Sequence, residues 1–175
     1  NRTHAINEGR NTEQHLMETV TRFLRDDLQS PHAPAPDPVY ETRTLHGWTL
    51  KIHRELLAAD ARETAKVLEL LDRQLDEITK VVLKAALAEL QQVPLYFNPE
   101  YPGVRPTAEY HPDAKWLRTN GRDPAMSRSV EFTNLRIYTA EVNRMPSFVL
   151  HELAHGYHDR VLPKGFANPE IAAAY

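Results

Sequence analysis

Four prolines within eight residues constrain this chain more firmly than any other feature of its sequence. They are Pro31, Pro34, Pro36 and Pro38. Proline fixes φ and removes a backbone donor, so this segment cannot continue a helix and favours an extended connector. We therefore expect three parts: an N-terminal arm over residues 1–30, a connector over 31–39, and a main domain over 40–175.

The arm carries apolar residues three or four positions apart on a charged background. They are Leu16, Met17, Val20, Phe23, Leu24 and Leu28. This spacing predicts an amphipathic helix over residues 8–29, and such a helix needs a surface to cover. That surface is either the main domain or another subunit, so self-association through this helix is one expected interaction.

Composition limits what the whole protein can do. Its 175 residues are 41% hydrophobic and 26% charged, which is typical of a globular protein that buries its own core. A formal charge of −3 offers no basic field for nucleic acid, and no apolar run approaches the ~18 residues of a membrane span. Because cysteine is absent, disulfides, thiolate zinc ligands and a cysteine nucleophile are excluded.

The two ends of the sequence look cut. The first residue is Asn1 rather than Met, which favours a processed, exported protein. The last residues, Ala172–Tyr175, resemble the interior of a helix and carry no stop signal. We therefore expect that the protein, and the main domain with it, is incomplete at the C-terminus.

The main domain alternates strand-like and helix-like stretches. A capping-box pattern, Asp60 followed by Glu63, opens the longest predicted helix. The other predicted elements are strands at Tyr40–His53, Pro94–Phe97 and Ser129–Tyr138, and helices at Lys84–Gln92, at Asp113–Arg118 and after Arg144–Ser147. This pattern predicts an α+β domain that is mainly helical and has a small sheet.

The last of these helices contains His151-Glu152-Leu153-Ala154-His155, an H-E-x-x-H motif. At ~100° per residue, the two histidines lie ~40° apart on one face, one turn from each other, and can meet one Zn²⁺ ion. Glu152 is rotated ~100° from His151, beside the metal rather than on it, where it can accept a proton from the metal's water. The alternative is a solvated helix face that spells the motif by chance.

Two polar residues continue this face. His158 lies ~10 Å along the axis from His151, too far to share its metal. It therefore supports the site or faces substrate, or is simply solvated. Asp159 either orients a ligand imidazole through its free N–H or pairs with Arg160 or Lys164 at the surface.

A catalytic zinc needs a third protein ligand and an open position. The metzincin pattern requires a histidine six residues after His155, but Val161 stands there. The gluzincin pattern takes a glutamate from a following helix, and Asn168-Pro169 begins such a helix. Glu170 is the candidate third ligand, although an acidic residue in a first turn also occurs simply for the helix dipole.

The stretch Leu150–Leu162, followed by Asn168–Ile171, resembles a group of bacterial zinc metallopeptidases. Their zinc-binding region is similar to the catalytic domain of anthrax lethal factor, a gluzincin. The resemblance implies a zincin-like fold, zinc binding by His151 and His155, and Glu152 as general base. It also implies a third glutamate ligand on a later helix, preceded by a tyrosine that stabilises the transition state. No such stretch occurs before Tyr175, so the third ligand is expected beyond it and the activity of these 175 residues stays open.

The predicted function is zinc-dependent peptide-bond hydrolysis by metal-activated water, with Glu152 as general base. The partner is a peptide or protein substrate, which the Ser129–Tyr138 stretch could bind as an exposed edge strand. The alternative is a catalytically silent module that binds metal or another protein and retains the zincin helix. A zinc-free hydrolase has little support, because the sequence has neither a G-x-S-x-G motif nor cysteine.

Overall fold

The structure is a computed structural model that describes residues 39–174. The protein divides into two units, residues 1–36 and 37–175, and the described residues belong to the second. The predicted N-terminal arm (1–30), and the predicted connector (31–39) except for Val39, lie outside the described residues.

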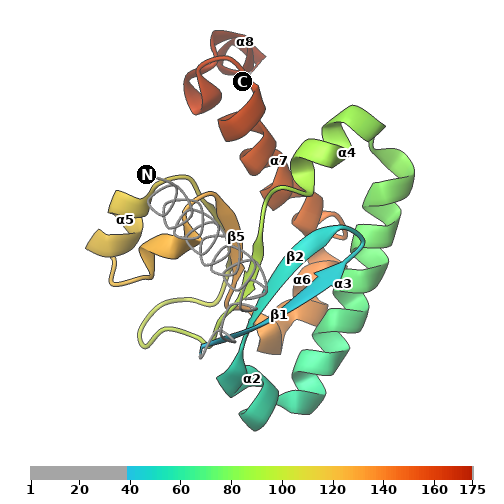
Figure 1. The fold of residues 1–175 in the computed structure, drawn as a ribbon, viewed down its shortest axis with the longest axis vertical. Helices are drawn as coiled ribbons and strands as arrows, with labels where there is room; N and C mark the ends of the chain where they lie inside the picture. Colours follow the sequence, from blue (N-terminus) through green and yellow to red (C-terminus); the bar gives the residue numbers. More distant parts are fainter. Residues whose placement is uncertain (1–38, 175) are drawn as a thin grey trace, which may run out of the picture. The chain divides into compact units, whose positions relative to one another are not determined.

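One mixed sheet of five strands forms the centre of the described unit (Figure 1). The strands follow the spatial order β1-β2-β3-β5-β4. Their bounds are β1 (Tyr40–Leu45), β2 (Trp48–His53), β3 (Leu95–Phe97), β4 (Ala108–His111) and β5 (Ser129–Phe132). The central strands β2, β3 and β5 run parallel, whereas β1 and β4 are antiparallel to their neighbours. In the part of the protein that the structure describes, β4 is therefore an edge strand.

Helices supply most of the regular structure in residues 39–174. They are α2 (Arg54–Ala59), α3 (Ala61–Val81), α4 (Lys84–Leu90), α5 (Ala114–Thr119), α6 (Tyr138–Arg144), α7 (Phe148–Val161) and α8 (Pro169–Ala174), with 3-10 turns at Pro124–Met126, Leu135–Ile137 and Gly165–Ala167. The expectation of a mainly helical α+β domain with a small sheet is confirmed. None of these helices combines the length and the apolar character that crossing a membrane requires.

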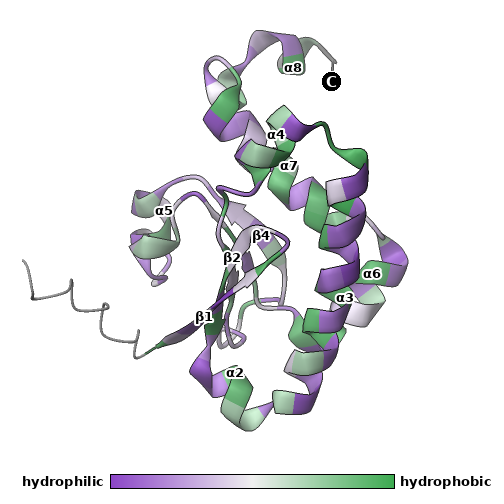
Figure 2. Cartoon of the chain, turned by 45° about the vertical axis from the view of Figure 1, so that its right-hand side comes forward, coloured by the Kyte–Doolittle hydropathy of each residue, from purple (hydrophilic) through white to green (hydrophobic). Residues whose placement is uncertain are grey.

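The core lies between α3, α7 and one face of the sheet. Apolar residues alternate along the central strands because successive side chains point to opposite faces, and Leu50, Leu95 and Val130 share the buried face. Along α3, hydrophilic and hydrophobic residues form alternating bands (Figure 2), as expected of a helix with one buried face. Figure 1 shows α3 on one side of the sheet and α5 on the other.

Helix α3 begins where the sequence predicts, but the predicted cap does not form. Asp60 occupies the N-cap position, yet its side chain makes no capping hydrogen bond. Its carbonyl oxygen accepts the N–H of Thr64 instead, so the backbone alone starts the helix.

The predicted strand over Ser129–Tyr138 is only partly correct. Strand β5 ends at Phe132, and a 3-10 turn over Leu135–Ile137 leads into α6 at Tyr138. Moreover, β5 lies between β3 and β4, so its backbone groups are paired on both sides. The expectation that this stretch is an exposed edge is therefore wrong, and the edge belongs to β4.

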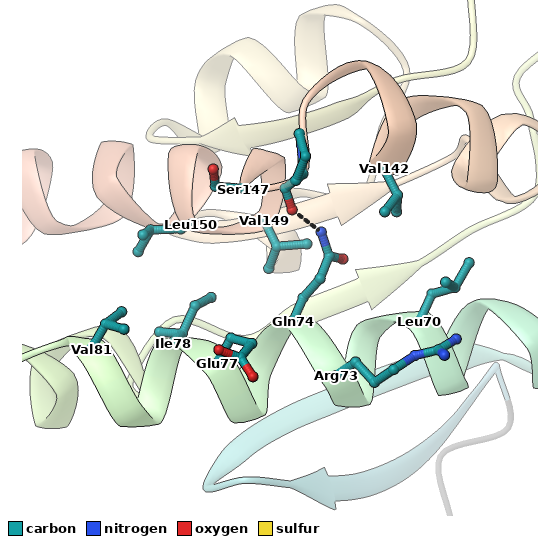
Figure 3. Close-up of a pocket in the computed structure, with 11 residues that line it drawn as sticks. Leu70, Arg73, Gln74, Glu77, Ile78, Val81, Val142, Ser147, Val149 and Leu150 are labelled. Atoms are coloured by element: carbon teal, nitrogen blue, oxygen red, sulfur yellow. Dashed lines mark hydrogen bonds between the residues drawn. The ribbon is translucent and has the colours of Figure 1, made fainter.

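The start of α7 is fastened to α3 by the side-chain amide of Gln74. Its nitrogen donates to the carbonyl oxygen of Pro146 at 2.7 Å, as Figure 3 shows, and its oxygen accepts the hydroxyl of Tyr138 at 3.0 Å. Further along α7, Gly156 is buried close to Val93 and Tyr110. These contacts fix both the start and the middle of the helix that carries the H-E-x-x-H motif.

Candidate functional site

His151 and His155 lie one turn apart on α7, and their side chains converge. The two Nε2 atoms are 3.2 Å apart, a hydrogen-bond distance at which one neutral imidazole donates to the other, and the ring centroids are 4.7 Å apart with the rings nearly perpendicular. His151 is exposed and His155 is half-buried, so both imidazoles are accessible from the surface side of the helix. The spacing of the motif along one helix face produces this pair.

The separation of the two nitrogens suits a shared metal ion. Two nitrogens that each lie 2.0–2.1 Å from one zinc ion at the tetrahedral angle are about 3.3–3.4 Å apart. The observed 3.2 Å is within about 0.2 Å of that value. Neutral imidazole is also a preferred ligand of zinc, so the donor chemistry of the pair fits this ion.

Burial favours the neutral form of His155. It lowers the pKa of this imidazole, and the neighbouring His151 and His158 lower it further. These surroundings therefore favour the protonation state in which an imidazole has a free lone pair.

In the described part of the protein, only two side chains of a type that can ligate a metal meet at this point. Among residues 39–174, no group of three His, Cys, Asp or Glu side chains is placed to hold one ion. Glu170 lies exposed in the first turn of α8, where Asn168 caps the helix by accepting the backbone N–H of Glu170 at 2.9 Å. The predicted N-terminus of this helix is therefore present, but Glu170 is not brought to the histidine pair.

Glu152 reaches from α7 to the backbone of β4. Its Oε2 accepts the N–H of Tyr110 at 3.1 Å. Burial raises the pKa of Glu152 to about 7, against the opposing effect of this hydrogen bond, and Glu109 adds a smaller rise. A carboxyl group with a pKa near neutrality can both accept and donate a proton under physiological conditions.

The carboxylate of Asp159 does not bond to either imidazole of the pair, although one interpretation of the sequence was that it orients a ligand imidazole. Its Oδ2 accepts the phenol hydroxyl of Tyr110 at 2.9 Å and lies 3.7 Å from the Nε of Arg128. Its partners are thus neither an imidazole nor the two cations named from the sequence. His158 lies beside the pair, with its ring centroid 6.4 Å from that of His155.

The edge of β4 faces the same region. The carbonyls of Thr107 and His111 accept N–H groups on the β5 side, so in an antiparallel pair the backbone groups of Ala108 and Tyr110 point outward. The bond from Tyr110 to Glu152 uses one of these outward N–H groups. An extended peptide could pair with this edge directly beside Glu152.

A pocket of about 650 Å³ opens in front of His151 and Glu152. Its walls are residues 105–108, which lead into β4, the C-terminal end of α6, and the start of α7. This volume lies within the range of ordinary ligand sites, about 300–1,000 Å³. The structure therefore places His151 and Glu152, though not His155, at the wall of a cavity.

A second pocket, of about 630 Å³, lies between α3 and the start of α7 (Figure 3). Its lining is largely apolar, with Leu70, Ile78 and Val149 among its residues. Neither histidine of the pair contributes to it, so it is separate from the candidate site.

Behind β4, on the face of the sheet opposite α7, a charged cluster is buried around Glu131. This carboxylate accepts from His111 at 2.8 Å and from Arg122 at 3.0 Å, and also from Asn98 and Tyr101 at 2.6 and 2.7 Å. Burial pushes the pKa of Glu131 upward, but the hydrogen bonds from His111, Asn98 and Tyr101 outweigh it and hold the pKa below the ordinary value. The cluster ties the edge strand to the loops that cover it.

Comparison with known proteins returned no matching family model, no matching curated protein and no matching solved structure.

The sequence did not reveal β4 or its attachment to the site. Ala108–His111 is four residues long and lies in a stretch rich in proline and glycine, so it carries too little alternation to predict a strand. The outward N–H of Tyr110 is a backbone group and leaves no signal in the sequence. The H-E-x-x-H motif, in contrast, was visible because both of its histidines lie on one element.

Proposed function

We propose that this protein is a zinc-dependent peptidase in which His151 and His155 hold the metal and Glu152 is the general base. The 3.2 Å convergence of the two Nε2 atoms carries the proposal, because it matches the bite of a tetrahedral ion. The adjacent pocket and the edge of β4 that pairs with no other described strand supply a place for a peptide. The resemblance to gluzincins supports the same reaction and a zincin-like fold.

Zinc bound at this pair would lower the pKa of a coordinated water and polarise the scissile carbonyl. Glu152 then accepts the proton of the attacking water and delivers it to the leaving amine. In the metal-free protein burial raises its pKa to about 7, so this carboxyl group can change its protonation state near neutrality.

Substrate binding and the action of Glu152 are linked through Tyr110. A peptide that pairs with β4 takes over the N–H that Glu152 now accepts at 3.1 Å. The displaced carboxylate then turns to the pocket that it lines together with His151. Binding of the peptide thereby frees Glu152 from the Tyr110 N–H, so that it can act as general base on the bound substrate.

The experiment combines zinc analysis with peptide hydrolysis on the full-length protein. Glu152→Gln should keep zinc and lose hydrolysis by about 10²–10⁴-fold, because it removes only the proton acceptor. His151→Ala and His155→Ala should lose both zinc and activity, while His158→Ala serves as the matched histidine control and should keep both. Hydrolysis by zinc-loaded Glu152→Gln at the unmutated rate would refute the role of Glu152.

A second function is favoured by one observation. Because residues 39–174 bring only two ligands together, the helix could serve a catalytically silent module that binds metal or another protein. A site with three protein ligands should retain zinc against a mild chelator, whereas two histidines and water should release it. Zinc that resists the chelator, and that anomalous scattering locates within bonding distance of three protein atoms, would exclude a silent module with a two-ligand site.

A further inference from the structure

The pocket in front of His151 is lined by one cation that forms no direct ion pair with any of the described residues. Four charged side chains line it: Arg105, Glu141, Arg144 and Glu152. Arg144 donates from Nε and Nη2 to Glu141, at 3.1 and 2.5 Å, so these two charges offset each other. Arg105 is exposed and forms no ion pair or side-chain hydrogen bond with any residue between 39 and 174.

Neither carboxylate forms a direct ion pair with Arg105, although Glu141 is close enough to feel its charge. Arg105 and Arg144 both hold the pKa of Glu141 low, with Arg144 the stronger influence, so Glu141 stays ionised and bound to Arg144. Glu152 is turned toward the Tyr110 N–H at 3.1 Å. The guanidinium of Arg105 is therefore available to an anion that enters the pocket.

The backbone fixes where Arg105 lies relative to a peptide. Pro106 restricts Arg105 to extended conformations, and Thr107 then leads directly into β4. A peptide antiparallel to β4 runs from the His111 end toward Ala108, so its C-terminal half passes over the pocket and meets Arg105. For a peptide paired in this antiparallel direction, the guanidinium would meet the part of the substrate that follows the scissile bond.

We propose that this pocket selects peptides by binding a carboxylate through Arg105. The carboxylate belongs either to an acidic residue that follows the scissile bond or to the free C-terminus of the peptide. The proposal rests on the proposed function in taking a peptide paired with β4 as the ligand. A guanidinium donates two parallel hydrogen bonds to a carboxylate, which gives it a preference over the isosteric amide.

Binding of matched fluorescent peptides to the full-length Glu152→Gln variant tests this without turnover. One pair differs only by Glu against Gln, and a second only by a free against an amidated C-terminus. The preferred acid should bind about tenfold more tightly than its amide. The responding pair identifies the source of the carboxylate, and equal affinities in both pairs would overturn the proposal.

Two arginine variants assign the preference to the pocket. Arg105→Ala should abolish it and Arg105→Glu should reverse it toward a Lys-containing peptide. Arg118→Ala removes the same charge from exposed residues of α5 outside the pocket and should leave the preference intact. Repeating the titration with a chelator shows whether the carboxylate binds to Arg105 or to a metal. A preference that disappears when the metal is removed would contradict the proposal. A preference that Arg105→Ala leaves unchanged would also contradict it.

The same peptides separate this proposal from the proposed function. Hydrolysis by the unmutated, zinc-loaded protein without any preference for a carboxylate would overturn the role of Arg105 and leave the peptidase standing. Arg105-dependent binding with no hydrolysis of any peptide would support the pocket and refute the peptidase.

Discussion

At the scale of single residues, Glu131 shows how a buried charge can organise a strand edge. Its side chain is 1% exposed, and donors from four other residues surround it. A buried carboxylate is tolerated only when it is paired and hydrogen-bonded, and here Arg122 supplies the counter-charge while His111 adds a hydrogen bond. Because His111 belongs to β4, Glu131 contributes to the placement of the edge beside α7.

Replacing Glu131 by glutamine should destabilise the protein by about 3 kcal/mol at pH 7, because Arg122 would lose its buried counter-charge. The folded-state pKa of Glu131 lies below its ordinary value of 4.5, so its contribution is complete above pH 4.5. That contribution is lost as the pH falls through the folded-state pKa. The difference in the free energy of unfolding between Glu131→Gln and the unmutated protein should therefore become smaller below pH 4.5. Urea unfolding at pH 7 and at an acidic pH would measure this change.

Glu100→Gln is the control for this prediction. Glu100 pairs with Arg136, whose side chain is 75% exposed, so its loss should change the free energy of unfolding by less than about 1 kcal/mol. A loss of stability in Glu131→Gln that stays constant across pH would contradict the electrostatic explanation.

At the scale of elements, the contact between α7 and β4 depends on Gly156. A Cβ atom at this position would lie 2.9 Å from Cγ2 of Val93 and 3.1 Å from Cε2 of Tyr110. Helix propensity alone would favour alanine by about 1 kcal/mol. The crowding acts in the opposite direction, because both neighbours belong to the packed core.

Gly156→Ala should therefore lower the free energy of unfolding by about 1–2 kcal/mol, since overpacking outweighs the gain in propensity. Hydrogen exchange at the β4 amides should also become faster, because the strand is pushed away from α7. The double variant Val93→Ala/Gly156→Ala removes the closest neighbour and should recover part of the loss. A strictly additive double variant would show that Val93 is not the obstacle.

The elements that the sequence predicted are those with a strong local pattern. The helix over Lys84–Gln92 is present as α4, the strand at Pro94–Phe97 as β3, and the helix after Arg144–Ser147 as α7. Helix α6 was hidden because Tyr138–Arg144 continues a strand-like stretch, and the turn of the backbone after Phe132 depends on tertiary packing.

In the candidate site, too, the features with a local sequence pattern could be predicted and those that depend on distant residues could not. The pair His151 and His155 follows from the helical period alone, and the structure brings their nitrogens together. The partners of Glu152 and Asp159, in contrast, converge on Tyr110, more than 40 residues earlier in the sequence. A single sequence contains no pattern that joins residues so far apart, so these partners could not be predicted.

At the scale of the whole molecule, the proposed metal should contribute to stability. A ligand that binds only the folded state stabilises it by about 2.7 kcal/mol at a hundredfold excess over its Kd. For a domain of this size, zinc should then raise the Tm by roughly 5–10 °C, and a chelator should reverse the rise. Calorimetry with and without zinc measures this.

His151→Ala and His155→Ala should each abolish the rise in Tm, whereas His158→Ala should preserve it. His158 provides the matched change because it lies on the same helix, with its ring centroid 6.4 Å from that of His155. An equal rise in all three variants would place the stabilising zinc elsewhere in the protein.

The contacts that Tyr110 makes with α7 require one particular register of β4. Its N–H, ring and hydroxyl contact Glu152, Gly156 and Asp159, three positions along one stripe of α7, while its neighbour His111 reaches Glu131 on the opposite face. A slip of one residue would exchange the two faces of the strand and break both attachments together. Evolution or design could therefore vary the side chains of this strand, but inserting or deleting a single residue within it would detach the edge from the helix.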